Sequence, residues 1–139
     1  MSEQEVVTVL SDDEALALMS TAQLGRLVVR RNDDMDLFPV NFVIDDGIIY
    51  FRTAEGAKLF TVNLNHDVLF EADHYADDAA WSVIVKGTAS VVTATKDIQH
   101  ADTLPLRPWL PTVKYNYVTI TPNSISGRKF RLGEEPERY

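Results

Sequence analysis

The 139-residue chain contains no cysteine, which excludes disulfide bonds, cysteine-ligated zinc and thiol catalysis. The absence also fits a reducing compartment, so we expect the protein in the cytoplasm. Positive charge is scarce: 13 Lys and Arg side chains stand against 21 Asp and Glu side chains, and the net charge is −8. A surface of this sign repels phosphate backbones, so we expect no general nucleic-acid binding, and any anion site must be built locally.

Long apolar segments and recognisable catalytic motifs are also missing. No stretch approaches the roughly 18 apolar residues of a membrane span, and the N-terminus lacks the pattern of a signal peptide. Three histidines lie far apart, without the spacing of a metal site, at His66, His74 and His100. We therefore expect one domain over residues 1–139, with a loose tail at 133–139 and no metal or membrane partner. We identify no catalytic acid or base.

Strand patterns dominate what is present. Short helices are predicted over 12–21, where Ser11 and Glu14 form a capping box, and over 55–63 and 95–104. Strands are predicted at 24–31, 37–45, 48–53, 67–73, 81–93, 114–121 and 124–132. Many short strands and few helices predict a mainly β protein, built as a small and largely antiparallel barrel.

The connections between these strands carry turn and bend signals. Residues 32–36 are predicted to form an acidic turn and residues 74–80 a polar, acidic loop. Gly87 marks a bend or bulge within one strand, and Gly127 marks a break within the last one. The three prolines of residues 105–112 exclude regular structure there.

The segment Phe38–Leu59 contains the most specific local signal. Its Asp46-Gly47 dipeptide suits a type I′ turn, which pairs Asp45 with Ile48 and so fixes the register of a hairpin. The same register gives the further pairs Ile44 with Ile49, Val43 with Tyr50, Phe42 with Phe51, Asn41 with Arg52, and Val40 with Thr53.

The two faces of this hairpin differ in character. One face is apolar and is predicted to join the core, with Val40, Phe42, Ile44, Ile49 and Phe51. The opposite face is mixed, with Asn41, Val43, Tyr50 and Arg52. The register therefore predicts that an amide and a guanidinium lie side by side, away from the core.

Two cations, a hydroxyl and a glycine close the hairpin within seven residues. Arg52 supplies a planar fork, Lys58 a point charge and Thr53 a hydroxyl, all of which suit a phosphate. A helix that begins near Gly56 and Ala57 would bring its unpaired N–H groups to the same place. We interpret the segment as a phosphate site and expect both cations to be exposed. The alternative is a solvated turn with ordinary surface charges, and spacing alone does not decide between the two.

Two tryptophans stand near possible ligand positions. Trp81 and Ser82, at the start of a predicted strand, offer an aromatic wall and a hydroxyl to a planar ligand. For Trp81 the alternative is core packing. Trp109, among prolines, is either a lid or dimer contact or, again, a packing residue.

Taken in order, several segments resemble the pyridoxamine 5′-phosphate oxidase-like, FMN-binding split-barrel family, above all its branch of nitroimidazole-resistance-type reductases. The matching segments are LGRLVV (24–29), FPVNFVIDDGIIYFRTAEGAKL (38–59), DVLFEAD (67–73) and WSVIVKGTASVV (81–92), with SGRKF (126–130) as a weaker match. The resemblance spans roughly residues 11–131. It implies a split β-barrel that forms a homodimer, with the flavin outside the barrel at the dimer interface.

The resemblance also implies roles for individual residues. It implies that the FMN phosphate is held by Arg52, Thr53, Ala57 and Lys58. It implies that the isoalloxazine ring lies along the backbone of Val40, Asn41 and Phe42. Trp81 and Ser82 would then sit near the ring or its ribityl chain.

The activity implied is that of an oxidoreductase, which passes electrons from a reduced nicotinamide-type donor to a small organic acceptor. Arg52 stands where nitroimidazole-resistance relatives often have His, which argues against nitroimidazole as the acceptor. The residues by which pyridoxamine-phosphate oxidases grip their substrate have no clear counterpart. Three alternatives stay open: a deazaflavin-dependent reductase, a flavin-binding protein without turnover, and a cofactor-free barrel whose dimer cleft binds another ligand.

Overall fold

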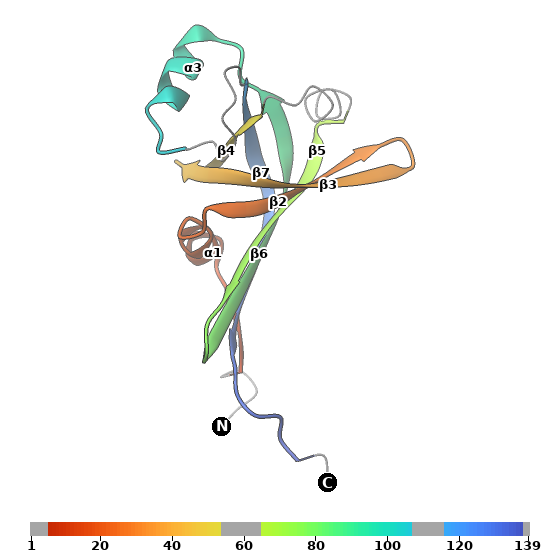
Figure 1. Cartoon of the computed structure of the whole chain (residues 1–139), viewed down its shortest axis with the longest axis vertical. Coiled ribbons are helices and arrows are strands. Elements are labelled where there is room, and N and C mark those ends of the chain that lie inside the picture. Colours follow the sequence, from red (N-terminus) through yellow and green to blue (C-terminus); the bar gives the residue numbers. More distant parts are fainter. Residues whose placement is uncertain (1–5, 54–64, 107–115, 138–139) are drawn as a thin grey trace.

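The computed structural model describes residues 6–53, 65–106 and 116–137 (Figure 1). Within these ranges the chain forms two helices, α1 (Asp12–Met19) and α3 (Thr95–Asp102). The strands are β1 (Val7–Leu10), β2 (Leu24–Arg31), β3 (Asp34–Asp45), β4 (Ile48–Thr53), β5 (Asp67–Tyr75), β6 (Ala79–Val91) and β7 (Asn116–Arg131). They form one antiparallel sheet in the order β1-β7-β4-β3-β2-β5-β6, which closes through β6 and β7. The predicted antiparallel barrel is therefore confirmed.

β7 closes the barrel through one edge and pairs with two different strands through its other edge. One edge of β7 pairs with β6 over almost its whole length, while the other edge pairs first with β4 and then with β1. Helix α1 covers the sheet where the partner of β7 changes. A Cβ atom added to Gly127 would lie 2.6 Å from the Cβ atom of Ala15, so the glycine allows α1 to pack directly on the strand. Ala15 and Met19 are fully buried as a result.

The hairpin of β3 and β4 follows the predicted register. The ladder pairs Asp45 with Ile48 at the turn and continues to Phe42 with Phe51. Asp46 and Gly47 have φ angles of 49° and 76°, the left-handed values that a type I′ turn requires. The predicted core face is confirmed: Val40, Phe42, Ile49 and Phe51 are at most 5% exposed, and Ile44 packs against the same core.

The last two predicted hairpin pairs lie beyond this ladder. Asn41 pairs with Leu24 of β2, while Arg52 and Thr53 pair with the start of β7. The predicted pairs Asn41 with Arg52 and Val40 with Thr53 were therefore wrong, because the ladder of β3 and β4 ends at Phe42 and Phe51. Asn41 and Arg52 are each adjacent to a member of the last pair, Phe42 and Phe51, which face the core. Because side chains alternate along a strand, Asn41 and Arg52 both lie on the outer face.

Several predicted boundaries were wrong because the ladders continue through polar residues. The turn predicted at 32–36 ends before Asp34, where β3 begins, and the loop predicted at 74–80 is confined to 76–78. β7 is continuous through Gly127, where a break was predicted, because this glycine accommodates α1 instead. The bulge at Gly87 is confirmed by a register shift in the ladder of β6 and β7. β1 was not predicted at all.

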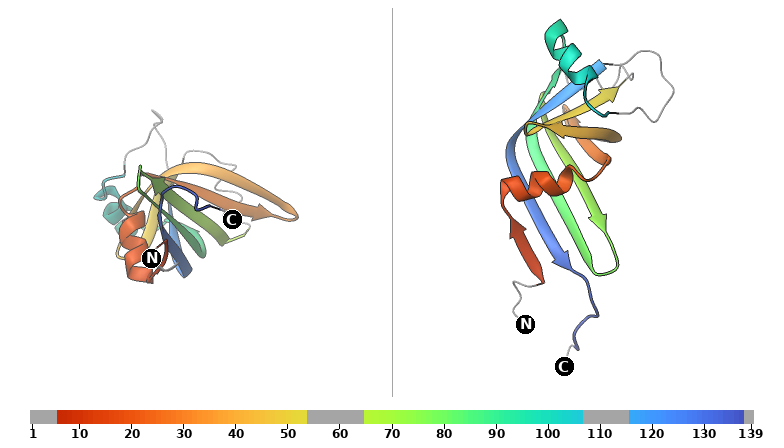
Figure 2. Two further views of the ribbon diagram at one scale, coloured as in Figure 1. Left: turned by 90° about the horizontal axis from the view of Figure 1, so that it is seen from below. Right: turned by 90° about the vertical axis from the view of Figure 1, so that its left-hand side faces the viewer.

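The helices lie on different parts of the barrel. α1 crosses its side, and α3 lies at the end opposite the two termini (Figure 2). The helix predicted over 55–63 and most of the proline-rich segment 105–112 lie outside the described residues. Neither described helix is long and apolar enough to cross a membrane.

Candidate functional site

The outer face of β3 and β4 is covered by α3 and the segment that follows it. Val43 and Tyr50 on this face pack against a second, smaller apolar cluster of the protein. The buried members of this cluster are Ala101, Leu106 and Tyr117. The mixed face of the predicted hairpin is therefore half-buried, and α3 forms a wall above it.

Two side-chain contacts fasten α3 to the barrel. Nε2 of His100 lies 2.8 Å from Oδ2 of Asp45, at the exposed end of β3. The hydroxyl of Tyr117 on β7 donates a 2.6 Å hydrogen bond to Oδ1 of Asp102, the last residue of the helix. Both contacts lie in the last turn of α3, so they fasten this end of the helix to β3 and β7.

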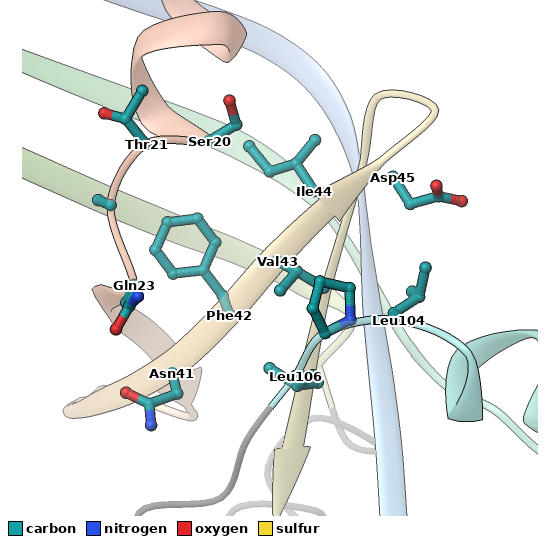
Figure 3. A pocket seen from close by; sticks show the side chains of 12 residues that line it. Ser20, Thr21, Gln23, Asn41, Phe42, Val43, Ile44, Asp45, Leu104 and Leu106 are labelled. Atoms are coloured by element: carbon teal, nitrogen blue, oxygen red, sulfur yellow. The ribbon is translucent and has the colours of Figure 1, made fainter.

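A pocket of about 550 Å³ lies along the edge of β3. Its lining comes from three segments, residues 20–23 after α1, residues 41–45 of β3, and residues 104–106 after α3 (Figure 3). This volume falls within the range of about 300–1,000 Å³ that is typical of small-molecule sites. Of the residues predicted to bind a cofactor, Asn41 and Phe42 line the pocket.

Arg52 does not line this pocket itself but contacts its wall from the border. Its Nη1 atom donates a 3.4 Å hydrogen bond to the carbonyl oxygen of Leu106, which lines the pocket. Its guanidinium carbon lies 5.9 Å from the ring centroid of Tyr117. Thr53, the next residue of β4, is only 5% exposed. Arg52 was expected to be exposed and is half-buried instead, because the segment after α3 passes over it.

The rest of the predicted phosphate site lies outside the described residues. Gly56, Ala57 and Lys58 belong to segment 54–64, so their roles stay a prediction. Val40 points into the core and is 5% exposed, and its backbone lies in the ladder of β2 and β3 opposite Gly25, so its predicted role stays a prediction.

Trp81 and Ser82 lie far from Arg52 in the same chain. Trp81 is 8% exposed and packs in the main core, whereas Ser82 points outward and pairs with Asp73 and Arg128. Arg52 pairs across the sheet with Tyr117 of β7. The carbonyl of Tyr117 in turn accepts a hydrogen bond from the amide of Val92, just after β6, so Val92 marks the row of Arg52 on that side. Ten residues of extended chain, about 30 Å, separate Ser82 from that row. The predicted residues therefore do not form one site within a single chain, and the role of Trp81 and Ser82 stays a prediction.

Burial shifts the pKa of two side chains on the outer surface. Burial raises the pKa of Tyr50 beneath α3, and the carboxylates of Asp45, Asp97 and Asp46 add to this, so its hydroxyl stays protonated. On β5, burial and the neighbouring Asp73 carboxylate raise the pKa of Glu71 despite its 2.6 Å contact with Arg26. Within the part of the chain that the structure describes, no group of three acidic or histidine side chains gathers to hold a metal ion.

Sequence reasoning did not find the wall of the pocket. Tyr117 gave no signal beyond the alternation of its strand, and Asp102 gave none beyond its place in a short helix. Their hydrogen bond joins residues 15 positions apart, and the contact between Arg52 and Leu106 joins residues 54 positions apart. Such pairings depend on where α3 packs, which local patterns do not determine.

A closed antiparallel barrel, split along one strand and flanked by a pocket on its outer face, is the architecture of split-barrel proteins. The family model of pyridoxamine 5′-phosphate oxidase matches residues 11–129. The chain belongs to this family, as the resemblance over roughly 11–131 predicted.

Three solved structures illustrate the likeness. A Corynebacterium glutamicum protein, named as a candidate pyridoxamine 5′-phosphate oxidase, is 58% identical, with a TM-score of 0.90 over 97% of this chain and 99% of its own. An FAD binding protein from Mycobacterium smegmatis is 40% identical, with a TM-score of 0.79 over 91% of this chain and 100% of its own. A Bacteroides thetaiotaomicron protein, named as a candidate 5-nitroimidazole antibiotic resistance protein, shares the fold at 12% identity, with a TM-score of 0.75 over 90% and 88% of the two chains.

Proposed function

We propose that this chain is a flavin-binding protein whose site holds the riboflavin-phosphate unit common to FMN and FAD. The single observation that carries the proposal is the position of Arg52 at the border of the pocket along β3. The 40% identical relative that is named as an FAD binding protein supports the same class of ligand. We propose FMN as the cofactor, and FAD is the alternative because this relative is named as an FAD binding protein.

The residues present fit such a group. Arg52 and Thr53 are adjacent at the end of β4, but their side chains leave the strand on opposite faces. The guanidinium of Arg52 is on the outer face and suits a phosphate, whereas Thr53 is 5% exposed, so the role of its hydroxyl stays a prediction. The pocket beside Arg52 runs along Asn41 and Phe42, where a planar ring would lie against β3. The amide of Phe42 itself donates to the carbonyl of Gln23. Gly56, Ala57 and Lys58 would complete the phosphate site, as the sequence predicts.

The proposed site is completed by a second copy of the chain. Ser82 lies about 30 Å along its strand from the row of Arg52. One FMN molecule whose phosphate is bound at Arg52 is too short to contact Ser82 of the same chain. If Trp81 and Ser82 contribute to the site, they contribute from the partner protomer. A homodimer with the flavin between its protomers reconciles the predicted residues with the observed separation.

The proposed activity is that of an oxidoreductase, which transfers electrons from a reduced nicotinamide-type donor to a small organic acceptor. The bound flavin would supply the redox chemistry. The chain's own part is to orient the ring along β3, to neutralise the phosphate with Arg52, and to exclude water with the wall after α3.

The first test is the identity of the molecule that copurifies with the protein. We expect a visible flavin absorbance band, and mass spectrometry of the released ligand will distinguish FMN from FAD and from a deazaflavin. Addition of NADH or NADPH should then bleach the bound flavin. Failure of the purified protein to bind added FMN, FAD and riboflavin would refute the proposed function.

The second test removes the guanidinium. We expect Arg52→Ala to weaken FMN binding by about 1.5–3 kcal/mol, the scale of a lost charge-assisted hydrogen bond. Lys58→Ala carries the same expectation from the sequence. Arg30→Ala is the matched control, because Arg30 is exposed on β2. Unchanged FMN affinity in both Arg52→Ala and Lys58→Ala, by titration calorimetry, would show that the site is misplaced.

A further inference from the structure

A buried tyrosine supports the guanidinium at the border of the pocket. Tyr117 is 5% exposed and is the cross-strand partner of Arg52 in the ladder of β4 and β7. The distance of 5.9 Å between the guanidinium carbon and the ring centroid is within the range of a cation–π contact. The ring therefore restricts one side of the space that the guanidinium can occupy.

The tyrosine is itself fixed by a carboxylate. Asp102 accepts a 2.6 Å hydrogen bond from the Tyr117 hydroxyl at the end of α3. Four residues farther along, the carbonyl oxygen of Leu106 accepts the hydrogen bond from Nη1 of Arg52. This part of the chain therefore contacts the guanidinium directly through a carbonyl group and indirectly through the tyrosine.

An arginine side chain has many rotamers, and a ligand that must order them loses binding energy in doing so. A guanidinium that its neighbours already hold in one orientation avoids that loss. We infer that Tyr117 and Asp102 are positioning residues, which hold the guanidinium of Arg52 in the orientation that a flavin phosphate requires. The inference rests on the proposed flavin site. It connects Asp102, Tyr117 and Arg52 as a series of contacts that leads to the flavin phosphate.

The test compares FMN with riboflavin, which has the same ring system but no phosphate. Tyr117→Phe keeps the aromatic ring and removes the hydroxyl that Asp102 fixes. We expect the Kd for FMN to rise about three- to tenfold, the scale of one lost hydrogen bond, while the Kd for riboflavin stays unchanged. In an Arg52→Ala background, the same Tyr117→Phe substitution should have no further effect on FMN binding, because the group it positions is gone.

Three further variants separate positioning from general packing. Asp102→Ala should reproduce Tyr117→Phe, whereas Asp102→Asn should stay near wild type, because its amide oxygen can still accept from the hydroxyl. His100→Ala removes the contact of α3 with Asp45 and leaves Arg52 and Tyr117 in place. We expect this control to leave the ratio of FMN to riboflavin affinity unchanged.

The outcomes are distinct. Equal losses of FMN and riboflavin affinity in Tyr117→Phe, or additive effects of Tyr117→Phe and Arg52→Ala, would show a merely structural role and overturn the inference. Unchanged affinities in Tyr117→Phe would overturn it as well. If the wild-type protein binds neither flavin, the proposed function falls and the inference with it. Wild-type binding without the predicted selectivity in the variants refutes the inference alone.

Discussion

Two outer faces of the same barrel differ in what covers them. Over β3, β4 and the start of β7, the chain's own α3 packs against Val43 and Tyr50 and forms one wall of a pocket. Over β1, the end of β7, β6 and β5, outward side chains remain open, and Val9 and Tyr75 are 77% and 79% exposed. Among the described residues, α3 and residues 104–106 cover the first face, and the second face is where a partner would pack in the proposed homodimer.

The register shows how the open face is organised. One row of outward positions crosses four paired strands and consists of Val7, Phe130, Ala80 and Tyr75. The next row consists of Val9, Arg128, Ser82 and Asp73. Adjacent apolar side chains exposed on a sheet are typical of a protein contact. Ser82, a predicted flavin-site residue, thus lies on the face where the proposed second copy would pack.

The largest effect is expected from a charge on the open face. Ile84 points outward from β6, is 38% exposed, and lies between Glu71 and Ser126 on the neighbouring strands. If a partner covers this face, Ile84→Lys places a cation within the contact, and its desolvation opposes association even beside the Glu71 carboxylate, so we expect the dimer to weaken at least about a hundredfold. Flavin affinity should fall with it, because the site would lose its second half.

Light scattering after gel filtration will measure the molecular mass of each variant. A dilution series will give the protein concentration at which half of the dimer has dissociated. Gln99→Lys is the matched control, because it adds the same charge to an exposed position of α3. A dimer that survives Ile84→Lys, with the control unchanged, would assign the protomer contact to a face other than the open one.

The boundary between the two faces gives the second prediction. α1 packs where β7 changes partner from β4 to β1, and Gly127 leaves no room for a side chain beneath it. In Gly127→Ala the new methyl group would meet Ala15 at 2.6 Å, so the helix must shift. We expect the free energy of unfolding to fall by about 1–3 kcal/mol, as for other overpacked sites.

Urea unfolding followed by circular dichroism will measure the loss. Gly133→Ala is the control, since an added Cβ atom there meets nothing within 4 Å, and we expect a change within about 0.5 kcal/mol. Equal midpoints for both variants would mean that α1 does not pack as tightly as described.

The hairpin could be predicted from sequence because its determinants are local. Asp46-Gly47 sets the turn, and strict alternation then decides which side chains enter the core. Arg52 was found for the same reason, since its distance from the turn decides its face. The reasoning was wrong about its exposure, because nothing local shows that residues 104–106 return across β4.

The misplaced boundaries have a different physical cause. Turn residues such as Asp34 and the glycine at Gly127 have intrinsic preferences, but a ladder with a neighbouring strand outweighs them. β1 was missed because an edge strand of four residues depends on its pairing with β7 and has little pattern of its own. Local chemistry therefore predicted the covered hairpin better than it predicted the contacts that cover it.

The smallest effect concerns a carboxylate on the open face. Glu71 contacts Arg26 at 2.6 Å, yet burial and the nearby Asp73 raise its pKa above its ordinary value. The folded protein then binds this proton more tightly than the unfolded chain does. Its contribution to stability is full below the ordinary pKa and is lost as the pH rises through the raised value.

We expect Glu71→Gln to change the free energy of unfolding by no more than about 1 kcal/mol at pH 7, since the ion pair is partly exposed. The wild type should lose stability relative to Glu71→Gln between pH 4 and pH 7, in urea titrations at several pH values. Glu134→Gln, in the exposed tail, should show no such trend. If the wild type instead gains stability relative to Glu71→Gln over this pH range, the Arg26 contact lowers the pKa of Glu71 by more than burial raises it. Because a partner on the open face would bury Glu71 further, the trend should steepen at protein concentrations that favour the dimer.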